Sequence, residues 1–296
     1  MIVVGSNERV WSHMMASFTA VVWGATFIST KILLLDGMTP AEIMLLRFIL
    51  GYLLMCGFNH RIEKNVEWHD ELLFLMMGIF GGSGYFLAEN TALKYTQASN
   101  VALICALVPV VTALLSHVLV KSERFTTRFM FGACVAFLGV AVVVLNGRIV
   151  LELNPIGDLL TFVATVCWAI YCVIIKLLHR KYSVFYITRK MFFYGILSII
   201  PYFVFYEPFS FPMTGLLNTK VMLNVLFLGV VASGFCFLLW NRAMESLGVI
   251  ITNNYVFLIP AVTILVAHVF LDEQVTVFTF EGAALTIGGM WWTCRE

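Results

Sequence analysis

The chain has 296 residues, of which 61% are hydrophobic and 12% are charged, and its formal net charge is +1. Ordinary soluble domains carry roughly 25% charged residues, so this chain has about half the charge that such a fold uses to cover its surface. The composition excludes an ordinary soluble globular protein, and the near-zero net charge gives no reason to expect nucleic acid as a partner.

Apolar stretches separated by short polar breaks predict ten membrane-spanning helices. A helix needs about 20 predominantly apolar residues to cross the hydrocarbon core of a bilayer. In chain order, the expected spans are residues 12–34, 40–58, 72–93, 98–120, 126–146, 156–178, 184–206, 219–244, 248–270 and 279–294. We therefore expect an all-α integral membrane protein in which the first span is retained rather than cleaved as a signal peptide.

The distribution of Lys and Arg predicts the orientation of these spans, because positive charge is enriched in cytoplasmic loops. With the N-terminus inside, cytoplasmic segments hold eleven basic residues: Arg9, Arg61, Lys64, Lys121, Arg124, Arg128, Lys176, Arg180, Lys181, Arg242 and Arg295. The opposite side holds four: Lys31, Lys94, Arg148 and Lys220. We expect both termini to be cytoplasmic. The absence of organelle-targeting features suits a multi-pass protein of the bacterial inner membrane, an expectation that rests partly on the family resemblance given below.

The two halves of the chain repeat each other. A shift of 151 residues places residues 78–120 on 229–271 with twelve identities in 43 pairs. The informative pairs of this shift are Asn90 with Asn241, Pro109 with Pro260 and His117 with His268. Near the start of each half, Trp23 and Lys31 correspond to Trp168 and Lys176, and both pairs of residues are eight positions apart. We expect two five-helix repeats, residues 1–148 and 149–296. Because five is odd, the second copy enters the membrane from the opposite side, and such inverted-topology repeats are typical of alternating-access transporters.

Several features together resemble a known family. They are the Trp23-Gly24-x-x-Phe27 run that ends in Lys31, the Pro109 helix followed by Glu123, and a glycine-spaced fifth helix. These features resemble the drug/metabolite transporter superfamily, and the paired repeats are similar to its EamA-type transporters. The resemblance covers nearly the whole chain. It implies a ten-helix bundle with a central cavity between the halves, and activities that include export of amino acids and other metabolites.

Glu89 is the clearest candidate for a functional residue, since an ionisable group inside a membrane span is costly and marks function by default. It could be the counter-charge for an ammonium group or a proton carrier. The alternative is a structural carboxylate that pairs with Lys94 or Lys31 near the outer interface, or one that simply snorkels to that interface.

The other candidate substrate-binding residues are aromatic or amide side chains: Trp23, Tyr85, Asn90, Trp168, Tyr171, Trp240 and Asn241. Trp23 and Trp168 lie near the middle of their spans, not at the ends where aromatic belts form. They could line a cavity or simply fill space. The paired Asn90 and Asn241 could line the cavity or hydrogen-bond neighbouring helices. The second half reads Trp168-Ala169 where the first reads Trp23-Gly24, so the two indoles need not do equivalent work.

Pro109 and Pro260 each leave a backbone carbonyl without its helical partner. In a membrane this is tolerated where the freed group meets another donor or a cavity, so we expect helix kinks that help to form the central cavity, with plain curvature for packing as the alternative. Arg47 and Arg189 could bind a substrate carboxylate, although snorkelling toward lipid headgroups is favoured.

Two other function classes remain open. A membrane-embedded enzyme acting on lipid-like substrates needs clustered carboxylates, but the cluster Glu63, Glu67, Asp70 and Glu71 is mixed with Lys64 and His69 and indicates a solvated start of a helix. A non-transport membrane scaffold has no soluble output domain to act through.

The leading prediction is a transporter, an exporter or a facilitator, that moves small metabolites such as amino acids by alternating access through a central cavity. The seven cysteines lack metal-site spacing and no phosphate-binding loop is present, so no metal or cofactor is expected. The expected partners are a small-molecule substrate and the lipid bilayer, and proton coupling and a homodimer stay open.

Overall fold

The computed structural model of the chain describes residues 6–58, 63, 66–120, 126–145, 154–271 and 276–294. Within these ranges all regular structure is helical, and nine helices are long and apolar enough to cross a membrane. The predicted all-α membrane fold is thereby confirmed. The last predicted span, 279–294, corresponds to a further helix, α14 (Val277–Cys294), which packs against α7 (Thr127–Leu145).

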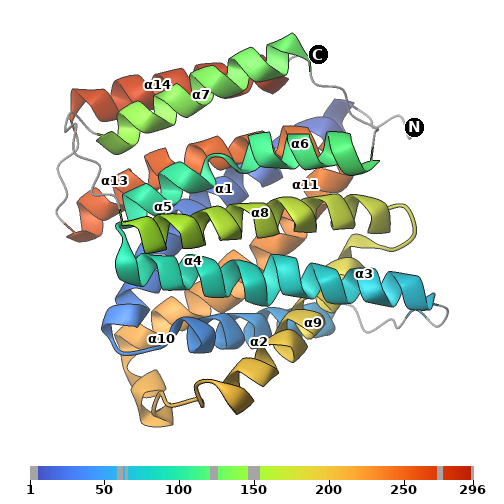
Figure 1. Cartoon of the computed structure of the whole chain (residues 1–296), viewed down its shortest axis with the longest axis vertical. Helices are drawn as coiled ribbons and strands as arrows, with labels where there is room; N and C mark the ends of the chain where they lie inside the picture. The colour runs from blue at the N-terminus through green and yellow to red at the C-terminus, as the bar shows by residue number, and fades with distance from the viewer. Residues whose placement is uncertain are drawn as a thin grey trace.

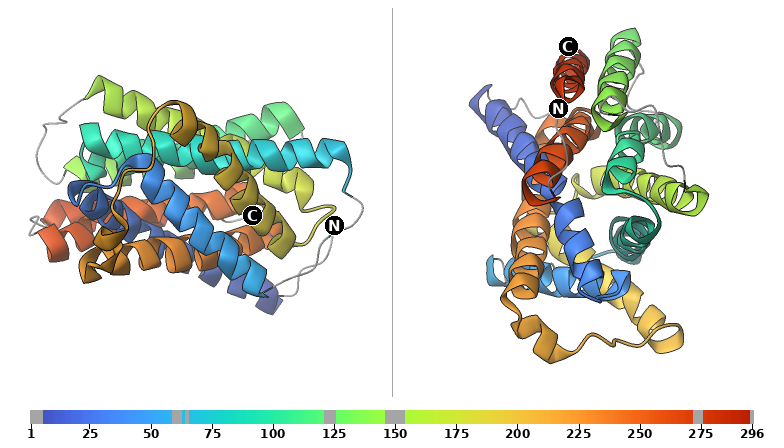
Figure 2. Two further views of the ribbon diagram at one scale, coloured as in Figure 1. Left: turned by 90° about the horizontal axis from the view of Figure 1, so that it is seen from below. Right: turned by 90° about the vertical axis from the view of Figure 1, so that its left-hand side faces the viewer.

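The helices lie side by side in one bundle, which Figure 1 shows from the side and Figure 2 also along its axis. Before α7, the first half contains α1 (Ser6–Leu35), α2 (Pro40–Phe58), α3 (Trp68–Gly78) continued by η1 (Ile79–Ser83) and α4 (Gly84–Tyr95), and α5 (Ala98–Cys105) followed by α6 (Val108–Val120). Charged residues named above that lie outside the described ranges are Arg61, Lys64, Lys121, Glu123, Arg124, Arg148 and Arg295.

The second half repeats this order of long helices. Before α14 it contains α8 (Pro155–Leu178), α9 (Val184–Phe205), the short 3-10 helix η2 (Met213–Leu217), α10 (Thr219–Leu226) continued by η3 (Phe227–Phe235) and α11 (Cys236–Leu247), and α12 (Val249–Asn253) continued by η4 (Asn254–Leu258) and α13 (Ile259–Leu271). Figure 1 shows α7 and α14 together at one edge of the bundle.

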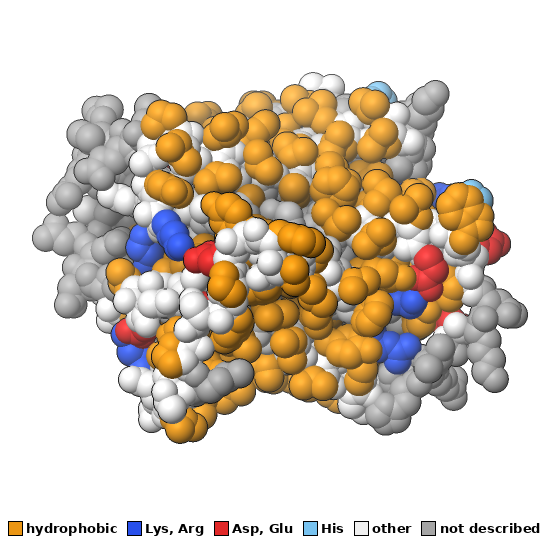
Figure 3. All heavy atoms as spheres, turned by 60° about the horizontal axis from the view of Figure 1, so that its bottom comes forward, with side chains coloured by type: hydrophobic (Ala, Val, Ile, Leu, Met, Phe, Trp, Pro, Cys, Tyr) orange, Lys and Arg blue, Asp and Glu red, His pale blue; other side chains and the backbone are white. Residues whose placement is uncertain are grey.

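The outer surface of the bundle is apolar. Large side chains such as Phe131, Leu138 and Phe205 are exposed, although a water-soluble protein would bury them. In Figure 3, hydrophobic side chains cover a broad central area, and Lys, Arg, Asp and Glu side chains gather toward its two edges. This distribution fits a hydrocarbon belt between two polar interfaces.

Local sequence signals set where the helices start. Asn154 accepts a hydrogen bond from Gly157 N at 3.2 Å and precedes Pro155, a favoured first helical residue, so α8 begins there. At the start of α2, Glu42 N donates to Thr39 Oγ1 (3.3 Å) and Thr39 N donates to Glu42 Oε2 (2.8 Å), which is a reciprocal capping box. The caps therefore fix where the chain turns back into the bundle.

Helices of one half pack against helices of the other in two matching sets. The third span of each half is a rod of three joined segments, α3–η1–α4 in the first half and α10–η3–α11 in the second. The first helix of each half contacts the third rod of the other half, since α1 contacts α11 and α8 contacts α4. The second helix does the same, since α2 contacts η3 and α9 contacts α3. The halves are thus interlocked rather than placed side by side.

Both third rods contain a π-helical segment, which the sequence analysis did not anticipate. The segments are η1 and η3, and the 151-residue shift places residues 79–83 on 230–234, inside η3. In η1, Gly82 has φ −117° and ψ −105°, which marks a kink. π-Helical turns are rare and are frequently found at functional sites.

Pro109 and Pro260, the predicted kink residues, lie at interruptions of their spans. Each is the second residue of a helix, α6 and α13 respectively. α6 follows the turn after Cys105, and α13 follows the 3-10 helix η4. At these first-turn positions the missing N–H of proline breaks no helical hydrogen bond.

The close contact of α7 with α14 depends on glycine. A Cβ on Gly289 would lie 2.4 Å from the backbone nitrogen of Ala136, and a Cβ on Gly139 would lie 2.5 Å from the backbone nitrogen of Thr286. These neighbours are backbone atoms that cannot move aside, so each glycine lets the helices approach.

We expect Gly289→Ala to lower the free energy of unfolding by roughly 1–3 kcal/mol, because the added methyl group overpacks this contact. Gly288→Ala is the matched control, since a Cβ at Gly288 meets nothing within 4 Å. Thermal unfolding of the detergent-solubilised protein measures both. Equal melting temperatures for the two variants would contradict the packing role of Gly289.

Candidate functional site

A cavity lies in the middle of the bundle, and the space in it that atoms do not fill, open solvent included, is about 480 Å³. Both halves contribute to the lining, which consists of Trp23, Thr26, Phe27, Arg47, Tyr85, Phe86, Glu89, Cys105, Val108, Trp168, Phe237, Val256 and Ile259. Four predicted substrate-binding residues are therefore brought together here: Trp23, Tyr85, Glu89 and Trp168.

Glu89 is 6% exposed and accepts a hydrogen bond from the Tyr85 hydroxyl one helical turn earlier on α4. In the described part of the chain no ion pair joins Glu89 to a basic side chain. Lys31, one of the partners considered above, donates instead to the Leu93 carbonyl at 2.5 Å. Glu89 is therefore a cavity carboxylate and not half of a structural salt bridge.

Arg47 also lines the cavity, and the snorkelling prediction for it is wrong. Its side chain is 3% exposed, its Nε donates to Ser233 Oγ at 2.9 Å, and its Cζ lies 4.2 Å from the centre of the Phe86 ring. Arg47 is the eighth residue of α2, about 10 Å along the axis from the helix start at a rise of about 1.5 Å per residue. At that depth the guanidinium turns inward to the cavity.

Two indoles, one from each half, meet in the cavity wall. The rings of Trp23 and Trp168 are edge-to-face with centroids 5.2 Å apart, a favourable aromatic geometry. Trp23 Nε1 donates to the Ala232 carbonyl at 2.9 Å, and Trp168 Nε1 donates to Asn253 Oδ1 at 3.0 Å. Because both indole nitrogens are satisfied by the protein, these rings present apolar surface to the cavity.

The remaining predicted substrate-binding residues lie behind the cavity lining. Asn90 Nδ2 donates to the Pro40 carbonyl at 3.2 Å, and Asn241 accepts from the Tyr171 hydroxyl at 2.5 Å. Trp240 is fully buried and its ring centroid lies 4.8 Å from that of Trp23. Both amides therefore hydrogen-bond neighbouring helices, which is the second of the two roles predicted for Asn90 and Asn241.

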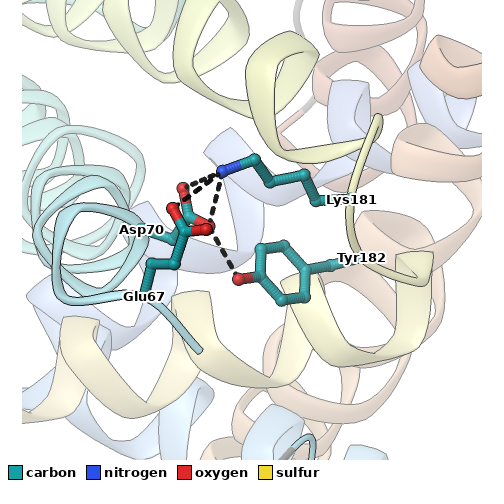
Figure 4. A network of polar contacts seen from close by, with 4 residues as sticks. All are labelled: Glu67, Asp70, Lys181 and Tyr182. Atoms are coloured by element: carbon teal, nitrogen blue, oxygen red, sulfur yellow. Dashed lines mark hydrogen bonds and ion pairs between the residues drawn. The ribbon is translucent and has the colours of Figure 1, made fainter. Parts of the chain in front are cut away.

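A polar network joins the halves at the end of the bundle where α3 begins (Figure 4). Lys181 Nζ lies 3.0 Å from Asp70 Oδ2 and 3.4 Å from Glu67 Oε2, and the Tyr182 hydroxyl donates to Asp70 at 2.7 Å. The hydrogen bonds to Asp70 raise the pKa of the Lys181 ammonium. Asp70 is only 4% exposed, so the prediction of a solvated start of a helix is wrong for this residue.

Comparison with known proteins decides the family. The EamA-like transporter family model matches the chain twice, at residues 10–145 and 155–295. The chain belongs to the EamA-like transporter family. The resemblance inferred from the sequence is thus confirmed, and the chain is a member of a family of multi-pass membrane transporters.

Relatives of this EamA-like transporter match over nearly their full length. An uncharacterized transporter of Archaeoglobus fulgidus is 28% identical, with 96% of this chain and 98% of the relative covered. The uncharacterized transporter YyaM of Bacillus subtilis is 28% identical, with 92% and 89% covered. A probable terminal-alkyne amino-acid exporter of Streptantibioticus cattleyicolor is 24% identical, with 96% and 92% covered. A solved crystal structure matches with a TM-score of 0.72 at 20% identity over 94% of each chain, which supports the fold.

For this EamA-like transporter, sequence reasoning considered Arg47 as a carboxylate-binding residue but favoured snorkelling, and it did not name Thr26 or Cys105 as cavity residues. For Arg47 a signal was present, because a charged residue deep in an apolar span is a functional candidate by default. Thr26 and Cys105 give no comparable signal, since small polar residues are common in membrane helices.

We expect Asp70→Asn to destabilise this EamA-like transporter by more than the roughly 0–1 kcal/mol of an exposed ion pair, because Asp70 is buried. Glu67→Gln is the matched control: its side chain is 70% exposed and it contacts the same ammonium group. Thermal unfolding of both variants in one detergent gives the comparison. Equal small effects would show that the buried contact adds nothing to the exposed one.

Proposed function

We propose that this chain is a ten-helix transporter that moves a small metabolite, such as an amino acid, by alternating access through the cavity between two inverted repeats, residues 1–148 and 149–296. The observation that carries the proposal is the pair of opposite charges in one buried cavity. Arg47 and Glu89 both line it, and no ion pair joins them within the described part of the chain.

Two charges in a membrane bundle that form no direct ion pair are costly unless something compensates them. A zwitterion supplies one opposite charge for each, so the cavity suits a molecule that carries both an ammonium and a carboxylate. The rings of Trp23, Trp168 and Phe237 surround this charge pair and suit an apolar side chain. The relative named as a probable amino-acid exporter supports the same substrate class.

Alternating access requires contacts that close each end of the cavity in turn. Asp70 precedes Tyr85 by 15 residues on one continuous rod, about 22 Å along the axis, so the Asp70–Lys181 contact lies well away from the cavity. Elsewhere, Glu42 Oε1 accepts hydrogen bonds from Ser210 N (2.6 Å) and Phe211 N (2.8 Å), again between the halves. We propose that these two contacts close opposite ends.

The distribution of basic residues places both termini and the Asp70–Lys181 contact on the cytoplasmic side of the bacterial inner membrane in this proposal. The Glu42 contact then lies on the outer side. If transport is coupled to protons, Glu89 is the proposed carrier, because it is the carboxylate that the cavity contains.

Counterflow uptake into proteoliposomes tests the proposal. The screen uses pools of radiolabelled amino acids and related metabolites, with wild type beside Glu89→Gln and Trp23→Ala. We expect saturable uptake of one pool by wild type and a loss on the order of tenfold or more in Glu89→Gln, since a hydrogen-bonded charge contributes about 1.5–3 kcal/mol.

Matched controls are Glu245→Gln and Trp11→Ala. Glu245 pairs with Arg242 outside the cavity, and Trp11 is 62% exposed on the same helix as Trp23. These variants should keep wild-type uptake. Unchanged uptake by Glu89→Gln would remove that residue from the mechanism, and no uptake of any pool by a folded wild type would contradict an amino-acid substrate.

A further inference from the structure

The guanidinium of Arg47 is fixed in the cavity by two contacts, a hydrogen bond to Ser233 and the face of the Phe86 ring. Its side chain is 3% exposed, it comes from α2 in the first half, and its Nε donates at 2.9 Å to Ser233 in η3 of the second half. The ring of Phe86 lies beneath it at 4.2 Å. The guanidinium is therefore held on one edge by a hydroxyl and on one face by an aromatic ring.

The opposite edge of this guanidinium is free to bind. Among the described residues its two terminal nitrogens meet no acceptor, and neither is sealed from the cavity. A guanidinium carries its N–H donors in a planar fork that matches the two oxygens of a carboxylate. Because Nε is hydrogen-bonded to Ser233, the N–H groups of the two terminal nitrogens are the donors that can bind a ligand.

We propose that Arg47 binds the carboxylate of the substrate through its two terminal nitrogens, and that Ser233 is the positioning residue that orients the guanidinium for this contact. The proposal rests on the proposed function and deepens it. Glu89, with the Tyr85 hydroxyl bonded to it, then faces the ammonium group. The substrate class is an α-amino acid with a free carboxylate, bound in one orientation.

The π-helical segment η3 connects this recognition to the other half of the protein. Ser233 bonds Arg47, and the carbonyl of the preceding Ala232 accepts the indole N–H of Trp23. The segment also approaches α2 closely, since a Cβ on Gly234 would lie 2.4 Å from Leu54 Cδ2. One short segment of the second half therefore sets the positions of two cavity side chains of the first half.

The arginine on the second long helix of the other half, Arg189, does not do the same work. Arg189 is half-buried, does not line the cavity, and has its guanidinium 5.4 Å from the ring of Tyr186. The carboxylate site is thus found on one side of the cavity, which gives the bound substrate a defined direction.

Equilibrium binding to the purified protein tests the proposal with four probes: L-phenylalanine, L-leucine and the carboxamide of each. The amide keeps the ammonium and the side chain but removes the negative charge. We expect wild type to bind each acid on the order of tenfold or more tightly than its amide, the range of a charge-assisted pair. Arg47→Gln should bind acid and amide alike.

Ser233→Ala should reduce the acid-to-amide ratio several-fold, and Ser233→Thr, which keeps the hydroxyl, should restore it. Ser83→Ala is the matched control, because the Ser83 hydroxyl also bonds across the halves, to Ser198 at 2.8 Å, outside the cavity lining. It should leave the ratio unchanged. The serine variants keep the proposal testable if Arg47→Gln fails to fold.

Three outcomes would overturn the assignment. An unchanged ratio in folded Arg47→Gln would exclude Arg47 as the carboxylate group, and equal effects of Ser233→Ala and Ser83→Ala would reduce Ser233 to a packing contact. Wild type that binds acids and amides equally would overturn this inference while leaving transport of a metabolite through the cavity intact. Wild type that binds neither would overturn both this inference and the proposed amino-acid substrate.

Discussion

A polar group inside a membrane bundle must be satisfied by the protein itself, because hydrocarbon offers it no hydrogen bond. Much of this structure follows from where those partners are found. Repeatedly they lie in the other half of the chain: Trp23 with Ala232, Ser29 with Asn224, Arg47 with Ser233, Asp70 with Lys181, and Thr263 with Gly24. Each of these contacts stabilises the interface between the halves, and those of Arg47 and Trp23 also shape the cavity.

The positions of the spans could be predicted from the sequence because apolar length decides whether a helix crosses a bilayer. The faces of those helices could not. In a membrane bundle both the core and the outer surface are apolar, so periodicity does not separate inward from outward residues. Trp23 and Glu89 were found because their types are unusual in mid-span. Arg47 was misread, since its partner Ser233 lies 186 residues away. Asp70 was misread for the same reason, since Lys181 is distant in sequence.

The duplication explains the scaffold better than it explains the site. The 151-residue shift pairs Glu89 with Trp240 and Gly82 with Ser233, so equivalent positions carry different chemistry. Even the retained pair Asn90 and Asn241 bonds unlike groups, a Pro40 carbonyl in one case and the side chains of Tyr171 and Thr188 in the other. Both charges of the cavity come from the first half. The backbone is repeated, whereas the chemistry of the cavity lining is not.

The π-helical segments η1 and η3 have wider turns than an α-helix, and they control which way the residues after them face. An α-helix rotates about 100° per residue, so one residue added to or removed from such a turn reorients everything that follows it. Tyr85 and Glu89 follow η1 directly, and Phe237 follows η3. Proteins of this architecture could therefore acquire a different ligand by changing the length of a single turn, with every lining side chain retained and only its direction altered.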